Sequence, residues 1–171
     1  MGKSIAAMVL AGILAIAAVP SLAEENESSS PAALAKVLPE AKLSLEQGLK
    51  ASVKSGKPIS GKYEIEDGAL QLSVYTAKGD EFTEVIVDHK SGTIKKAEKI
   101  TDNDDLKDAK EQGDAMAKAK VPLAQAVGKA VKANGGYRAV KVVPMLKGGK
   151  PIADVTLMKG ADMKKVAETL D

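Results

Sequence analysis

The chain has 171 residues, no cysteine and a single histidine, and its 25 basic residues against 23 acidic residues give a net charge of +2. The absence of cysteine excludes disulfides, thiolate metal sites and thiol nucleophiles, and one histidine excludes the paired imidazoles of HExxH zinc peptidases. This charge balance offers no broad cationic surface for nucleic-acid phosphates, so we expect neither a familiar class of enzyme nor a nucleic-acid-binding protein.

Residues 1–23 have the pattern of a secretory signal peptide. Lys3 supplies a positive start, residues 5–19 form an apolar run, and Ser21-Leu22-Ala23 is a small-x-small sequence. This run is shorter than the ~20 residues that cross a bilayer, so we favour cleavage after Ala23 over a retained membrane anchor. The pattern predicts a periplasmic or secreted protein with no membrane span after cleavage. Residues 24–40 begin with Glu-Glu-Asn-Glu-Ser-Ser-Ser-Pro and predict a flexible N-terminal tail with at most a short helical turn over 32–38.

An internal repeat organises the rest of the chain. When the chain is aligned with itself so that 41–47 lies over 119–125, Val53-Lys54 lies over Val131-Lys132. Six positions between 41 and 54 are identical to their counterparts. We therefore predict a duplicated fold, with one copy over 41–98 and the second over 119–171.

Each copy begins with a helix whose apolar residues recur at i, i+4 and i+8. Ser44 and Gln47 predict a capping box at the first helix, and Pro122 takes the matching place in the first turn of the second. Gly56 ends the first helix, and Asn134-Gly135-Gly136 ends the second. The apolar faces consist of Leu45, Leu49 and Val53 in the first helix and of Leu123, Val127 and Val131 in the second.

After each helix the apolar period falls to two, which indicates antiparallel strands. In copy one we expect three strands with turns at 67–68 and 78–80, and then a closing turn at 88–92 that leads to Thr93-Ile94. In copy two we expect strands over 137–146 and 152–158, and Pro144 predicts an edge or a bulge in the first of them.

Two segments complete this organisation. Residues 99–118 predict a helical linker, in which Thr101 and Asp104 resemble a capping box. Residues 162–171 fit either a helix capped by Asp162 or a third strand. Alignment of Leu170-Asp171 with Val87-Asp88 favours the strand.

The segment 43–49 resembles the "I-S-L-x-x-A" helix opening of the PepSY domain, and 63–68 with 70–75 resembles its first hairpin. Residues 87–94 are similar to its closing "V-D-x-x-(S/T)-G-x-I/V" turn, which is the most specific motif. Copy two matches the opening at 121–126 and stops at Asp171, where that turn would begin, so it is truncated or closes differently. The resemblance implies an α+β fold of two tandem PepSY-like units, each a helix packed on a small antiparallel sheet. It also implies a non-catalytic module that binds or restrains peptidases or other partners, and it supplies no catalytic residues.

We therefore expect a secreted, non-enzymatic module that binds an envelope or secreted protein, with a peptidase as one candidate, and that uses no metal or cofactor. The alternative is an envelope sensor or accessory protein that holds a small ligand or metal between the two repeats. A hydrolase would need His89 within reach of an acid and a nucleophile. Candidate contact residues are Tyr63 and Tyr137, placed on the matching first strands, and His89 in the closing turn. For His89 a solvated turn residue is the simpler interpretation.

Overall fold

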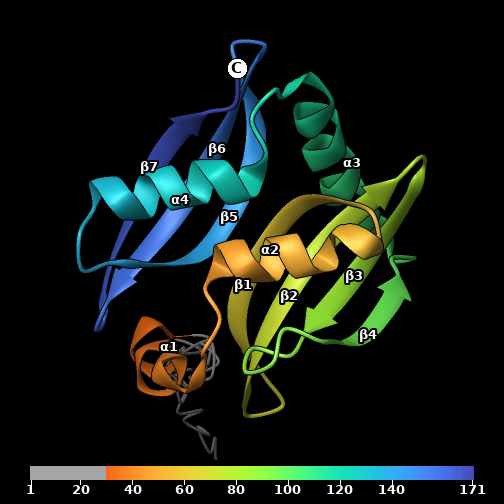
Figure 1. Cartoon of the computed structure of the whole chain (residues 1–171). Helices are drawn as coiled ribbons and strands as arrows, with labels where there is room; N and C mark the ends of the chain where they lie inside the picture. The colour runs from red at the N-terminus through yellow and green to blue at the C-terminus, as the bar shows by residue number, and fades with distance from the viewer. Residues whose placement is uncertain (1–29) are drawn as a thin grey trace, which may run out of the picture.

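The computed structural model describes residues 30–171, so the predicted signal peptide, its cleavage site and the start of the tail lie outside the described residues. Within that range, four α-helices, two 3-10 helices and seven strands follow one another (Figure 1). No helix among them is long and apolar enough to cross a membrane. In chain order the elements are α1 (Pro31–Val37), η2 (Leu38–Glu40), α2 (Leu45–Ala51), η3 (Ser52–Lys54), β1 (Lys57–Glu66), β2 (Ala69–Lys78), β3 (Glu81–Val87), β4 (Ile94–Lys99), α3 (Asn103–Lys118), α4 (Leu123–Ala133), β5 (Arg138–Lys147), β6 (Lys150–Lys159) and β7 (Asp162–Thr169).

The seven strands form one antiparallel sheet in the order β4-β3-β2-β1-β5-β6-β7. The fold class predicted from the sequence, two tandem PepSY-like units that each have a small sheet of their own, is therefore wrong. The first strands of the two repeats pair with each other, at Gly61 with Val142 and at Lys62 with Lys141. An unpaired edge strand is a template for another strand, and joining β1 to β5 removes two such edges at once. A repeat in the sequence does not show whether its copies share a sheet.

The repeat is nevertheless preserved inside this continuous sheet. The helices α2 and α4 begin at the aligned residues Leu45 and Leu123, whereas the segment from helix to first strand is slightly longer in the second repeat. Both first strands carry a bulge at the matching position, Ile59 in β1 and Val140 in β5. The bulge expected at Pro144 thus lies four residues earlier. Pro144 itself lies outside the short pairing with β1, so its missing N–H costs no hydrogen bond to that strand.

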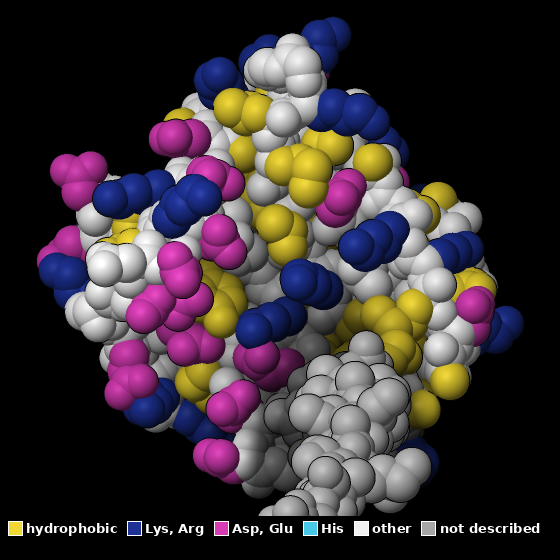
Figure 2. Space-filling model, turned by 180° about the vertical axis from the view of Figure 1, so that it is seen from behind, with side chains coloured by type: hydrophobic (Ala, Val, Ile, Leu, Met, Phe, Trp, Pro, Cys, Tyr) yellow, Lys and Arg dark blue, Asp and Glu magenta, His cyan; other side chains and the backbone are white. Residues whose placement is uncertain are grey.

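Helices cover both faces of the sheet. In Figure 1, α2 and α4 lie in front of the strands, with α3 behind them. The side chain of Leu72 points to α2, and that of Phe82 points to Gly113 of α3 on the opposite face. Figure 2 shows this rear face, where carboxylates gather on the left of the view, and basic and apolar side chains share its middle. The sheet and the helices on its two faces share one core, which contains residues of both repeats and of α3.

Several local predictions are confirmed. The capping box of Ser44 and Gln47 is present, α3 occupies 103–118 of the predicted 99–118 helical linker, and β7 is a strand. The cap of α3 is Asp102 rather than Thr101, because the Asp102 carboxylate accepts the first free N–H groups of the helix. Residues 31–40, expected in a tail with at most a short helical turn over 32–38, form α1 and η2. Burial of Leu38 at 6% exposure attaches this segment to the core.

Candidate binding groove

The two repeats hold each other through reciprocal hydrogen bonds. Lys57 begins β1 and Arg138 begins β5, so they occupy equivalent positions in the two repeats. Each extends its side chain to the backbone that precedes the helix of the other repeat. Lys57 Nζ donates to the carbonyl of Met116 at 2.5 Å, and Arg138 donates to the carbonyls of Leu38 at 3.2 Å, Ala41 at 3.1 Å and Leu43. The strand order is the same outward from β1 and from β5, so the two repeats are related by an approximate twofold axis. The alignment that places α4 over α2 also places Met116 over Leu38, so the two sets of hydrogen bonds follow this symmetry.

A groove opens beside Lys57, bounded by α2, by the start of α4 and by the end of α3. Its volume is about 700 Å³, and it continues into a neighbouring hollow of about 520 Å³ that shares five of its lining residues. Val53 lies in both and is 57% exposed, the highest value among the exposed large apolar side chains of residues 30–171. We call this the binding groove; its apolar lining includes Leu49, Val53, Pro58, Met116, Pro122, Leu123 and Ala124.

Lysines surround this apolar surface. Across the groove and its continuation, five lysines line the rim, and Glu46 is the one acidic residue with them. The salt bridges found within the described part of the chain involve none of the five. The rim lysines are Lys50, Lys54, Lys57, Lys78 and Lys120. The groove is therefore apolar at its base and positively charged at its margin.

The symmetry-related position of the second repeat differs from this groove. Val131, the counterpart of Val53, is partly buried against the core. Arg138, the counterpart of Lys57, is bound to three backbone carbonyls and lies with its guanidinium carbon 5.3 Å from the centre of the Tyr63 ring. The opposite wall of the groove also breaks the symmetry, since α4 presents the small residue Gly128 where α2 presents Lys50. The two repeats thus share a backbone fold, but their side chains differ at the groove and at its symmetry-related position.

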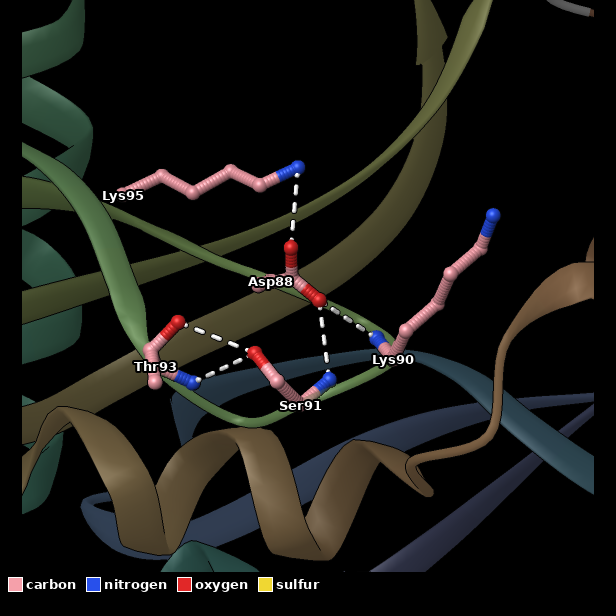
Figure 3. A network of polar contacts seen from close by, with 5 residues as sticks. All are labelled: Asp88, Lys90, Ser91, Thr93 and Lys95. Carbon is pink, nitrogen blue, oxygen red and sulfur yellow. Dashed lines mark hydrogen bonds and ion pairs between the residues drawn. The ribbon is translucent and has the colours of Figure 1, made fainter.

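The closing turn of the first repeat is a structural device (Figure 3). The Asp88 carboxylate accepts the N–H groups of Lys90 and Ser91, each at 2.8 Å, and it forms a salt bridge with Lys95 at 3.1 Å. These two backbone hydrogen bonds, with the Lys95 ammonium, hold the pKa of Asp88 well below its usual range. The Ser91 and Thr93 hydroxyls lie 2.9 Å apart on the same loop. Both oxygens of the Asp88 carboxylate are therefore used in holding the turn.

His89 is buried rather than solvated. It is 9% exposed, and its Nδ1 is buried with no hydrogen-bond partner among the described residues. Its carbonyl accepts the N–H groups of Lys42 and Leu43 before α2, as the carbonyl of Leu170 accepts those of Lys120 and Val121 before α4. His89 therefore corresponds to Leu170, a fully buried core residue, and the alignment of Leu170 with Val87 is wrong by two positions.

The two tyrosines also take unexpected places. Tyr63 is 4% exposed and donates its hydroxyl to the Leu43 carbonyl at 2.8 Å, so it is a core residue rather than a contact surface. Burial raises its pKa. Tyr137 precedes β5 instead of lying within it, and it donates to the Asp162 carboxylate, which raises the pKa of the phenol. Lys164 Nζ lies 4.0 Å from the centre of the Tyr137 ring.

The structure brings Tyr63 and His89 to the same residue, Leu43, and places Tyr137 beside β7. None of the three lines the binding groove. A signal for the groove was present in the sequence, because Lys50, Lys54 and Lys57 follow one another at intervals of four and three residues around Val53. These lysines alone do not predict a groove, because the end of α3 forms its third side and the sequence does not show where α3 lies.

A second, smaller cavity of about 250 Å³ lies between α3 and the rear of the sheet, where the repeats join. Lys62 and Lys141, paired across β1 and β5, line it together with Asp105 and Asp108 of α3. No group of three or more His, Asp or Glu side chains suited to a metal ion occurs between residues 30 and 171.

Comparisons with protein-family models, with curated proteins and with solved structures found no match to this chain.

Proposed function

We propose that the protein is an exported, non-enzymatic binding module that seats an apolar segment of a protein partner in the binding groove. The observation that carries this proposal is the exposed Val53 within a concave, largely apolar site of about 700 Å³. Binding pockets have this size and this apolar lining, and an apolar side chain left exposed in a concave site gains free energy when a partner covers it. The signal-peptide pattern of residues 1–23 and the PepSY-like motifs support export and a binding role.

The test is a peptide-display selection with residues 24–171 as the bait. We expect enriched peptides whose binding is lost with Val53→Gln and retained with Met163→Gln, a matched change at another exposed apolar side chain, on β7. Both side chains are exposed, so neither change threatens folding. A selection without enriched peptides, or with peptides that bind both variants equally, would show that the groove seats no peptide.

The PepSY resemblance makes a secreted metallopeptidase the first partner to examine. With thermolysin as the probe, residues 24–171 are expected to lower the rate of casein hydrolysis, and the Val53→Gln variant to restore it. Unchanged hydrolysis at a large excess of the protein would remove this peptidase from the candidate partners. The display selection tests partner binding independently of that result.

The second candidate is a sensor of a small polar ligand, and the cavity behind β1 and β5 favours it. Two lysines and two aspartates around about 250 Å³ suit a ligand that carries both charges. A thermal-shift panel of amino acids and other zwitterions tests this function, with Lys141→Met as the variant that should abolish any shift. Shifts that persist in this variant would place the ligand elsewhere.

A further inference from the structure

We infer that the segment seated in the binding groove is acidic as well as apolar: a short amphipathic stretch whose apolar side chains are flanked by Asp or Glu. This inference rests on the proposed function and specifies the chemistry of the partner. It follows from the distribution of charge around the groove, from the N-terminus of α4 that borders it, and from the shape of its walls on α2 and α4.

The first argument is charge complementarity. Five rim lysines against Glu46 leave an excess of four positive charges around the groove, although the whole chain carries only +2. Among the described residues these lysines form no salt bridge. Opposed potentials accelerate encounter and discriminate against wrong partners, so a segment with flanking carboxylates gains at this margin while a basic segment is repelled.

The second argument concerns the start of α4. Pro122 is the N-terminal cap of this helix and makes no side-chain hydrogen bond, in contrast to Ser44 with its complete capping box on α2. Pro122, Leu123 and Ala124 all line the groove. The positive end of an 11-residue helix thus adds to the field of the lysines, and a carboxylate placed there is favoured by both.

The third argument is steric. Ala124 and Gly128 form a low wall on α4, and a Cβ built at Gly128 would meet no atom within 4 Å. Val53 on the opposite wall is exposed, above the buried Leu49, and is then accessible to apolar side chains inserted from above. A backbone can approach the small residues closely while its flanking side chains reach the rim lysines. This arrangement is the pattern of a helix or extended segment laid in a groove.

The experiment uses residues 24–171 and three fluorescent 12-residue peptides with one leucine-rich centre and Glu, Gln or Lys flanks. Affinities are measured by anisotropy at 20 and 300 mM NaCl. At low salt we expect the Glu-flanked peptide to bind about tenfold more tightly than the Gln-flanked peptide, and the Lys-flanked peptide to bind most weakly. At high salt the advantage should fall to about twofold, because the Debye length shortens to a few ångströms.

Two matched variants locate the effect. The triple variant Lys50→Gln, Lys54→Gln, Lys120→Gln should bind the Glu-flanked and Gln-flanked peptides equally. The control triple variant at Lys90, Lys147 and Lys150, exposed lysines on turns and strand ends that do not line the groove, should keep the tenfold difference. These changes leave Lys57 and its hydrogen bond to Met116 intact.

The outcomes separate the two proposals. Equal affinity for the Glu- and Gln-flanked peptides, with loss of both in Val53→Gln, would overturn the acidic partner and leave the groove as a peptide site. Indifference of every peptide to Val53→Gln would overturn the groove itself. Sedimentation of the unliganded protein as a dimer that Val53→Gln dissociates would identify the occupant as a second copy and overturn the inference.

Discussion

The hydrogen bonds of Arg138 allow a sharp test of how the repeats are joined. Arg138→Ala removes a half-buried guanidinium that serves three carbonyls at once. Two of these carbonyls keep another donor, since Leu38 also accepts the Ala41 N–H at 3.1 Å and Leu43 also accepts the Tyr63 hydroxyl at 2.8 Å. The carbonyl of Ala41 has no other donor among the described residues. One acceptor is therefore left without its partner, and two lose half of theirs.

A hydrogen bond to a charged group contributes about 1.5–3 kcal/mol, and a buried unpaired acceptor costs about 1–3 kcal/mol. Because two of the carbonyls remain satisfied, we expect Arg138→Ala to lower the free energy of unfolding by about 2–3 kcal/mol. With a urea m-value of about 2 kcal/mol/M, the midpoint of denaturation should fall by about 1–1.5 M. Arg138→Lys should recover part of this loss, since an ammonium reaches fewer acceptors than a planar fork.

Lys57→Met is the matched control, because Lys57 occupies the equivalent position but makes one hydrogen bond from an exposed side chain. It should cost no more than ~1 kcal/mol. Equal losses in the Lys57 and Arg138 variants, or a loss below ~0.5 kcal/mol for Arg138→Ala, would show that the carbonyl contacts do not hold the segment before α2. Urea denaturation followed by circular dichroism measures both variants.

Three further predictions concern the first repeat. His89→Leu should raise the free energy of unfolding by about 1–2 kcal/mol, because it replaces a buried unpaired nitrogen with the side chain found at the equivalent Leu170; a lower thermal midpoint would contradict this. Gly48→Ala should be destabilising by about 1–2 kcal/mol despite its better helix propensity, because the new Cβ would lie 2.5 Å from Leu72 Cδ2; a rise in the urea midpoint would refute the predicted overlap. Asp88→Ala should lower the free energy of unfolding at neutral pH. Because the pKa of Asp88 is depressed in the folded protein, its carboxylate is stabilising above the unfolded-state pKa of about 4, and the difference from the parent protein should shrink as the pH falls below that value. A difference that stays constant down to pH 2 in urea titrations would disprove the role of the ionised group.

Local order was legible in the sequence wherever the determinants were close along the chain. The capping box at Ser44 and the Asp67-Gly68 turn were predictable because each depends on residues within one turn of backbone. The pairing of Gly61 with Val142 was not, since nothing in the alternation of either strand indicates which edge meets which. The contact between β1 and β5 depends on how α2 and α4 pack over a common sheet, which involves residues far apart in the chain.

Burial of individual side chains was the least predictable property. Gly48 lies over Leu72 in the first repeat, whereas Ala126 and Ala153 occupy the same two positions in the second. The helix position is thus larger and the strand position smaller in the second repeat. Only a comparison of both positions together reveals this compensation. Position 89 carries histidine where its counterpart carries leucine, so its polar character suggested solvent. Three-dimensional equivalence, rather than residue type, identifies it as a core site.

The reciprocal contacts of Lys57 and Arg138 are those of a symmetric dimer in which each subunit grips the other, yet both halves here belong to one chain. In a dimer of identical subunits every substitution occurs twice, so an opened groove on one side requires an opened groove on the other. Covalent fusion removes that constraint. One half of the interface can stabilise the fold through Arg138, while the other half is free to carry lysines and an exposed valine. Stability and the proposed recognition of a partner are then subject to separate selection.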